Sequence, residues 1–260
     1  MICLSWNCRE LGNPRTVQDL CLLVKVNKPD VVFLMEVMIK AGRVEALKRR
    51  LELDNCLVVE PIGKRGGLAL FWGRGVQLEI LNFSQWHISS KIRKEGGKKE
   101  WFFTGFYGHP DSSKRNLSWE LLASLVPKKG EAWCVARDFN EILLQSEKVG
   151  GKLRDEKSMG QFREVLEEKQ LTDLGCWGCP FTWSNKHEDH TFTKERLDRF
   201  LGNHEWRNIF KKVKVVGLTA LFSDHKPILM IAFDSSHTFV KRSRRFNFEA
   251  SWVKNEERER

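Results

Sequence analysis

Short apolar runs that end on polar side chains constrain the fold of this 260-residue chain most strongly. The first run alternates apolar and polar residues and ends at Asn7; the second, 31–35, is continuously apolar and is followed by Glu36. A third run leads into Asp138. Alternation predicts a strand with one buried face, and a continuous apolar run predicts a strand buried on both faces. Because strand ends converge at one rim of a layered α/β fold, we expect a functional site there.

Amphipathic segments alternate with these strands. Apolar residues recur at helical spacing in 15–26, 43–53, 114–126 and 156–169, which predicts helices that cover the sheets. Between the second and third helix, the chain predicts a meander of antiparallel strands at 68–72, 76–83 and 86–92. We expect one α/β domain over residues 1–235.

Composition narrows the class of partner. The formal net charge is +10 and the hydrophobic content is 41%, which favours a polyanionic partner and a sizeable core. No apolar run approaches the roughly 20 residues that span a bilayer, so we expect a nucleic acid and no membrane as the partner. No obligate protein partner is expected. Seven cysteines do not form a paired disulfide framework, and we expect an intracellular protein with reduced thiols.

Four further residues are candidates for a functional site. Asp224 and His225 stand side by side where a polar turn meets the apolar run 229–233, although such pairs are often only turn residues. Tyr107 is the one tyrosine against 17 phenylalanines and 10 tryptophans, which suggests that its hydroxyl is needed. Asp198 interrupts a strand-like segment, and a surface salt bridge is the alternative explanation for it.

Metal chemistry follows from the same residues. A carboxylate beside an asparagine suits Mg²⁺, a hard cation that prefers oxygen ligands, while an Asp and a His elsewhere could handle water and phosphate charge. Cys176 and Cys179 have the spacing of zinc ligands, but no second pair at ligand spacing accompanies them. Zinc is therefore disfavoured.

Six ordered motifs resemble those of the endonuclease/exonuclease/phosphatase superfamily, and the resemblance covers nearly the whole chain. They are Ser5-Trp6-Asn7-Cys8-Arg9, Met35-Glu36, Gly105-Phe106-Tyr107, Asp138-Phe139-Asn140, Arg196-Leu197-Asp198 and Ser223-Asp224-His225-Lys226-Pro227-Ile228. Four further stretches carry a finer resemblance: Leu11-Gly12-Asn13-Pro14, Gly66-Gly67-Leu68-Ala69, Phe181-Thr182-Trp183-Ser184-Asn185 and Arg245-Phe246-Asn247-Phe248-Glu249. With them, the chain is similar to endonuclease domains of plant LINE-type non-LTR retrotransposons. Six motifs in the correct order are far more specific than a lone Ser-Asp-His.

The resemblance implies a four-layer α/β sandwich, in which two mixed β-sheets pack face to face and are flanked by helices. It also implies a DNA endonuclease that nicks strands with Mg²⁺, or Mn²⁺ in its place. Metal ligands would be Glu36 and Asn7, with Asp224 bound through water or acting only as a structural acceptor. The resemblance also implies catalytic roles. Asp138 would be the base that activates the attacking water, and Asp198 would orient His225. Three groups would stabilise the phosphate, namely Asn140, Tyr107 and His225.

The chain also departs from the family pattern. Arg137 and Glu10 each stand at a position where the family has Gly. Val37 stands at a position where Thr is usual. If the Gly replaced by Arg137 has positive φ, the arginine would be strained by about 1–2 kcal/mol, and its charge would lower the basicity of Asp138. These departures leave open whether the chain is an active endonuclease or a decayed DNA-binding remnant. An inositol-phosphate or lipid phosphatase is a third possible function, because the superfamily's core chemistry does not itself select DNA.

The C-terminal residues 236–260 predict a basic linker. The basic cluster at 241–245 is typical of a solvated linker, and it also fits a nuclear-import signal. In intact elements of the resembled class, a reverse transcriptase follows, so we expect a linker truncated before that domain and a nuclear location.

Overall fold

The computed structural model describes residues 1–9, 11–63, 66–96 and 99–233. The departure at Glu10 and the linker predicted at 236–260 lie outside the described residues. All seven cysteines lie within the described residues, and none of them forms a disulfide bond there. No helix in the described part is both long and apolar enough to cross a bilayer.

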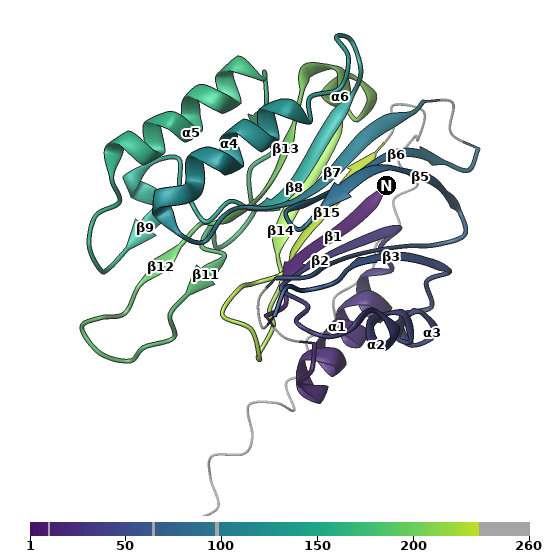
Figure 1. Ribbon diagram of the computed structural model, residues 1–260, viewed down its shortest axis with the longest axis horizontal. Coiled ribbons are helices and arrows are strands. Elements are labelled where there is room, and N and C mark those ends of the chain that lie inside the picture. The colour runs from purple at the N-terminus through teal and green to yellow at the C-terminus, as the bar shows by residue number, and fades with distance from the viewer. Residues whose placement is uncertain (10, 64–65, 97–98, 234–260) are drawn as a thin grey trace, which may run out of the picture.

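Two six-stranded sheets form the centre of the molecule (Figure 1). The first sheet has the order β14 (Lys212–Gly217), β15 (Ile228–Phe233), β1 (Ile2–Asn7), β2 (Val31–Met35), β4 (Leu68–Trp72), β3 (Asn55–Val59). The second has the order β10 (Thr172–Asp173), β13 (Asp198–Gly202), β8 (Trp133–Asp138), β7 (Trp101–Tyr107), β6 (His87–Lys94), β5 (Val76–Ser84). Both sheets are mixed, because β1 and β2 run parallel in the first and β7 and β8 in the second, while the other pairs are antiparallel.

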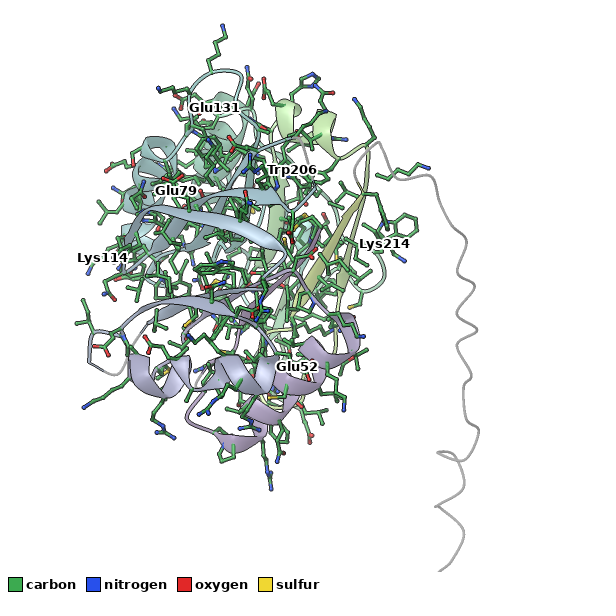
Figure 2. All side chains as sticks on the ribbon, turned by 90° about the vertical axis from the view of Figure 1, so that its right-hand side faces the viewer. Glu52, Glu79, Lys114, Glu131, Trp206 and Lys214 are labelled. Atoms are coloured by element: carbon green, nitrogen blue, oxygen red, sulfur yellow. The ribbon has the colours of Figure 1, made fainter. Side chains whose placement is uncertain are left out.

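Helices cover the outer face of each sheet. Figure 1 shows α1 (Pro14–Asn27), α2 (Ala41–Glu45) and α3 (Leu47–Leu51) on one side, and α4 (Arg115–Ser124) and α5 (Glu156–Glu168) on the other. Figure 2 shows the same arrangement from the side, with Glu52 at the end of α3 far from Glu131 in the other half. The predicted four-layer sandwich is confirmed.

Smaller elements complete the chain. They are a three-stranded sheet of β11 (Trp183–Ser184), β12 (Lys194–Glu195) and β9 (Lys148–Val149), the helix α6 (His204–Ile209), and the 3₁₀ turns η1 (Ser112–Lys114) and η2 (Gln145–Glu147).

Apolar cores hold the layers together, of which three are large. The central core lies between the sheets and contains Phe33 and Phe103, whose rings meet edge to face at 6.4 Å. A second core joins the first sheet to α1–α3, and a third joins the second sheet to α4 and α5. Local signals position the helices: Asn13 accepts a hydrogen bond from the Arg15 amide at the start of α1, and Pro14 occupies its first turn.

Two predicted elements differ from the structure. The segment 43–53 forms two short helices, α2 and α3, which meet at Ala46. The predicted meander at 68–92 is wrong at its first strand, because β4 pairs with β2 and β3 in the first sheet while β5, β6 and β7 form a meander in the second. The chain crosses between the sheets after Trp72, where Gly73 and Gly75 flank a turn.

Candidate active site

Strand ends from both sheets meet at one rim, and the alternation of side chains decides which residues face each other. Along β8, Cys134 and Ala136 lie in the central core, so Asp138 also faces inward. Tyr107 and Asp198 stand opposite Asp138 in the β7–β8 and β13–β8 registers. Asn7 continues the inward face of β1 from Cys3. The sandwich therefore directs these polar groups into the space between the sheets.

Asn7 links the two sheets at this rim. Its amide Nδ2 donates to Glu36 Oε1 at 3.1 Å and to Asp138 Oδ2 at 3.0 Å. The Tyr107 hydroxyl donates to the same Glu36 oxygen. Burial, together with the charges of Glu36 and Asp138, raises the pKa of Tyr107, so the phenol keeps its proton and remains a donor.

Asp138 is fully buried and multiply hydrogen-bonded. Its Oδ1 accepts the backbone amide of Asn140 at 2.9 Å, and the Asn140 side chain donates to the Gly108 carbonyl at 2.9 Å. Burial raises the pKa of Asp138, and the nearby Asp198 charge acts in the same direction, while His225 opposes both. Such a carboxylate binds a proton more readily than an exposed one.

His225 lies between two carboxylates. Its Nδ1 is 2.9 Å from Asp198 Oδ2, and its Nε2 is 3.7 Å from Asp138 Oδ2. Burial lowers the pKa of His225, but the charges of Asp198 and Asp138 outweigh that effect and raise it to about 10. The imidazole is therefore a cation near neutral pH. Asp198 is 3% exposed, so its explanation as a surface salt bridge is wrong.

Asp224 stands next to this cluster with partners of its own. Its Oδ2 pairs with the Arg9 guanidinium and accepts the Trp183 indole N–H at 3.0 Å. Its Oδ1 is buried and has no hydrogen-bond partner in the described structure. This oxygen is free to accept a further ligand.

Backbone strain marks the same rim. Arg9, Glu36, Met38 and Asn140 all have left-handed backbones, with φ of 39°, 52°, 52° and 52°. For residues other than glycine this conformation is costly, and it concentrates at functional sites. By simple alternation after Met35, Glu36 would face the helices; the left-handed turn instead allows its carboxylate to reach Asn7 and Tyr107.

Two sets of residues could hold a cation. The Asp138, Asp198 and His225 ligand atoms lie within 4.8 Å of one another, but contacts between the imidazole and both carboxylates occupy that space. The other set is the Glu36 carboxylate with the neighbouring Asn7 amide oxygen, which accepts the Arg9 amide at 3.3 Å. Because these atoms are all oxygens, the second set fits a hard divalent cation better.

The Arg137 side chain does not point into the site, although Arg137 directly precedes Asp138 in the chain. It lies inside β8, its φ is not positive, and its guanidinium lies 3.9 Å and 4.1 Å from the ring centroids of Phe139 and Phe106. These rings belong to the core beneath α4 and α5, on the face opposite Asp138. The expected backbone strain at Arg137 is therefore wrong.

Two hydroxyl residues position the site, although the sequence analysis assigned neither of them a role. Ser223 Oγ donates to the Asn7 carbonyl at 2.8 Å and accepts the His225 amide at 3.1 Å. Thr182 Oγ1 accepts the amides of Leu197 and Asp198. Hydroxyl residues are common in loops, so only the spatial arrangement identifies these two.

Comparison with known proteins supports the fold. The endonuclease domain of TRAS1, a telomere-specific non-LTR retrotransposon, is similar with a TM-score of 0.65 at 13% identity, covering 89% of this chain and 97% of that one. The 3'-5' exonuclease NExo from Neisseria meningitidis reaches 0.68 at 16% identity, covering 89% and 99%. The AP endonuclease LMAP from Leishmania major reaches 0.66 at 15%, covering 88% and 86%.

No curated protein matches the sequence. Residues 4–225 do match the Endonuclease/Exonuclease/phosphatase family, a span that includes every motif from Trp6 to His225. The two-sheet architecture, the polar residues at the strand ends and this match all indicate the same family. The chain belongs to the endonuclease/exonuclease/phosphatase family.

Proposed function

We propose that this chain is a Mg²⁺-dependent DNA endonuclease domain that nicks strands by phosphodiester hydrolysis. One observation carries the proposal: a single asparagine, Asn7, bonds both Glu36 and Asp138, while His225 lies between Asp138 and Asp198. A group able to hold a cation, a buried base and a cation for phosphate charge thus share one rim. The net charge of +10 suits a long polyanion.

Each residue has a separate task in the proposed reaction. Asp138 takes the proton of the attacking water as its oxygen bonds to phosphorus and the bond to the leaving oxygen breaks. The His225 imidazolium, the Tyr107 hydroxyl and the Asn140 amide stabilise negative charge on the phosphate oxygens. Asp198 orients the imidazole. Mg²⁺, held by Glu36 and Asn7 with Asp224 nearby, would supply Lewis-acid charge to the phosphate.

An origin in a LINE-type retrotransposon is part of the proposal. Its support is the motif set of the sequence and the similarity of fold to the TRAS1 domain. A plant source and a nuclear location stay predictions, and the basic cluster at 241–245 lies outside the described residues.

Plasmid nicking tests the activity. The protein should convert supercoiled plasmid to open circles in Mg²⁺, and EDTA should abolish the conversion. His225→Ala should slow nicking by on the order of 10²-fold, because a preformed charge at the phosphate is lost. The matched control is His187→Ala, an exposed loop histidine, which should leave the rate unchanged.

Plasmid binding and phosphate release, measured beside nicking, separate the alternatives. A folded protein that binds plasmid and never nicks it is a decayed remnant, and phosphate release from an inositol phosphate without nicking indicates a phosphatase. Equal nicking by His225→Ala and the parent protein would reject the assignment of this histidine.

A further inference from the structure

An open pocket adjoins the catalytic cluster. It encloses about 810 Å³, within the range of roughly 300–1,000 Å³ that is usual for small-molecule sites. Glu36 and Tyr107 line this pocket and also belong to the cluster around Asn7. A group bound here would therefore lie next to the reacting phosphate.

Stacked rings form part of the pocket lining. The Trp86 ring is nearly parallel to Tyr107, at 5.9 Å between centroids and 12° between planes, and it stacks on His109 at 4.8 Å. Met38 and Ile62 also line the pocket, and the Ile62 side chain is 72% exposed. Aromatic and aliphatic surfaces of this kind suit a flat, largely apolar ring.

Hydrogen bonds fix Trp86 in place. Its amide donates to Ser84 Oγ at 3.1 Å, and its carbonyl accepts the Tyr107 amide at 2.7 Å. Ser84 Oγ is in turn 2.8 Å from His87 Nδ1, and His87 is buried. These bonds hold the Trp86 backbone, and the contacts with Tyr107 and His109 hold its ring, so the aromatic surface is preorganised and the entropic cost of binding a planar group is lower.

The charges around the pocket are mixed. Arg9 and Lys114 line it, and Figure 2 shows Lys114 at the edge of the molecule, where a strand could pass. Glu36 and Asp111 line it as well, so the lining is not uniformly cationic. Two separated cations beside an aromatic stack suit one base flanked by backbone phosphates better than a compact polyphosphate.

We propose that this pocket binds one nucleobase that is unstacked from its strand, directly beside the phosphate to be cut. The inference rests on the proposed function, since it takes the neighbouring cluster as the phosphate site. It predicts that the protein prefers DNA with an unpaired nucleotide over a continuous duplex, because pairing withholds the base from the Trp86 stack.

A binding assay in EDTA, where cleavage is blocked, tests the pocket. The probe is an end-labelled duplex that carries one unpaired 2-aminopurine, compared with the same duplex that has an abasic residue at that position. The parent protein should bind the base-bearing duplex more tightly, and binding should change the 2-aminopurine fluorescence. Trp86→Leu should weaken binding of that duplex roughly 5- to 150-fold, the range for loss of one base–aromatic stack, and leave the abasic duplex unaffected.

Matched variants keep the test decisive. Ile62→Ala, at an exposed position that does not support the fold, should reduce the same preference, whereas Phe83→Leu, an exposed aromatic on β5 outside the pocket, should not. Equal binding of the two duplexes by the parent, or a preference that survives in Trp86→Leu, overturns the inference. Nicking without base-dependent binding rejects the pocket alone, and base-dependent binding without nicking rejects the proposed function alone.

Discussion

Arg137 is fully buried, and no charged partner pairs with it in the described structure. Both terminal guanidinium nitrogens lack a hydrogen bond there, while Nε donates to the Asp138 carbonyl at 3.4 Å and the faces of Phe106, Phe139 and Trp119 surround the group. Burial lowers the pKa of Arg137 well below its usual range, although the Asp138 charge opposes the shift. Cation–π contacts stabilise the group by about 2 kcal/mol, which is less than the several kcal/mol that desolvation of an ion costs.

Replacing this arginine should therefore stabilise the protein when its volume is kept. Arg137→Met should raise the free energy of unfolding by about 1 kcal/mol or more, because an unpaired buried charge is removed. Arg137→Gly should be about 2–5 kcal/mol less stable than the Met variant, because it leaves a cavity among the rings. Urea denaturation measures both. A Met variant less stable than the parent would contradict this account, and the nicking rate should not change in the Met variant.

The position of Arg137 could have been predicted from its sequence neighbour. Residues adjacent in a strand face opposite sides of the sheet, so once Asp138 faces the site, Arg137 must face the helices. The same alternation makes Asn7, Tyr107 and Asp198 predictable as inward-facing groups. Glu36 is different, since the left-handed turn that aims its carboxylate leaves no signal in the run 31–35.

At the scale of elements, a buried charge cluster braces the loop that carries Asn140. Glu195 on β12 is 2% exposed and binds both Arg154 and Lys148. Arg154 also donates to the Asn140 carbonyl at 3.3 Å. The Arg154 guanidinium thus connects the small sheet of β9, β11 and β12 to the rim of the candidate site, in addition to the hydrogen bond from Trp183 on β11 to Asp224.

Removing Glu195 should be costly. Glu195→Ala leaves the Arg154 charge without its bidentate partner, and we expect a loss of about 3–5 kcal/mol in the free energy of unfolding. Asp54→Ala is the control, because its partner Arg74 is 90% exposed and exposed pairs contribute about 0–1 kcal/mol. Chemical denaturation of both variants checks the difference. Similar losses for the two pairs would show that burial is not the deciding factor.

This cluster could not be predicted from the sequence. Arg154 and Glu195 are 41 positions apart, and charged residues are frequent throughout the chain. Nothing local distinguishes these two from solvated charges. Their pairing depends on how β12 returns beside β9, which only the tertiary structure determines.

At the scale of the whole molecule, the layer order was predictable and the division of strands between sheets was not. Alternating strands and helices, together with the ordered motifs, indicated two sheets flanked by helices. The sequence predicts one meander from Leu68 to Ile92 because short Gly-rich or polar turns join these strands, although β4 is continuously apolar and β5 alternates. The pairing of β4 with β2 and β3 depends on long-range contacts that local patterns do not encode.

The close approach of the two sheets depends on Gly105 in β7. A Cβ at this position would lie 2.5 Å from the Phe33 ring of the opposite sheet, and Phe33 is fully buried against Phe103. Gly105→Ala should therefore lower the free energy of unfolding by about 1–3 kcal/mol, the usual cost of overpacking. Gly42→Ala, in α2 where nothing lies within 4 Å, should instead stabilise by about 0.5–1 kcal/mol.

A double-mutant cycle identifies the cause. If the cost comes from the Phe33 ring, Phe33→Leu should destabilise the Gly105→Ala background by less than it destabilises the parent, because the smaller side chain makes room for the new methyl group. Thermal or urea unfolding of the four proteins gives the coupling energy between the two positions. Additive effects would mean that the methyl group is accommodated elsewhere, and that Phe33 does not set the separation of the sheets at this point.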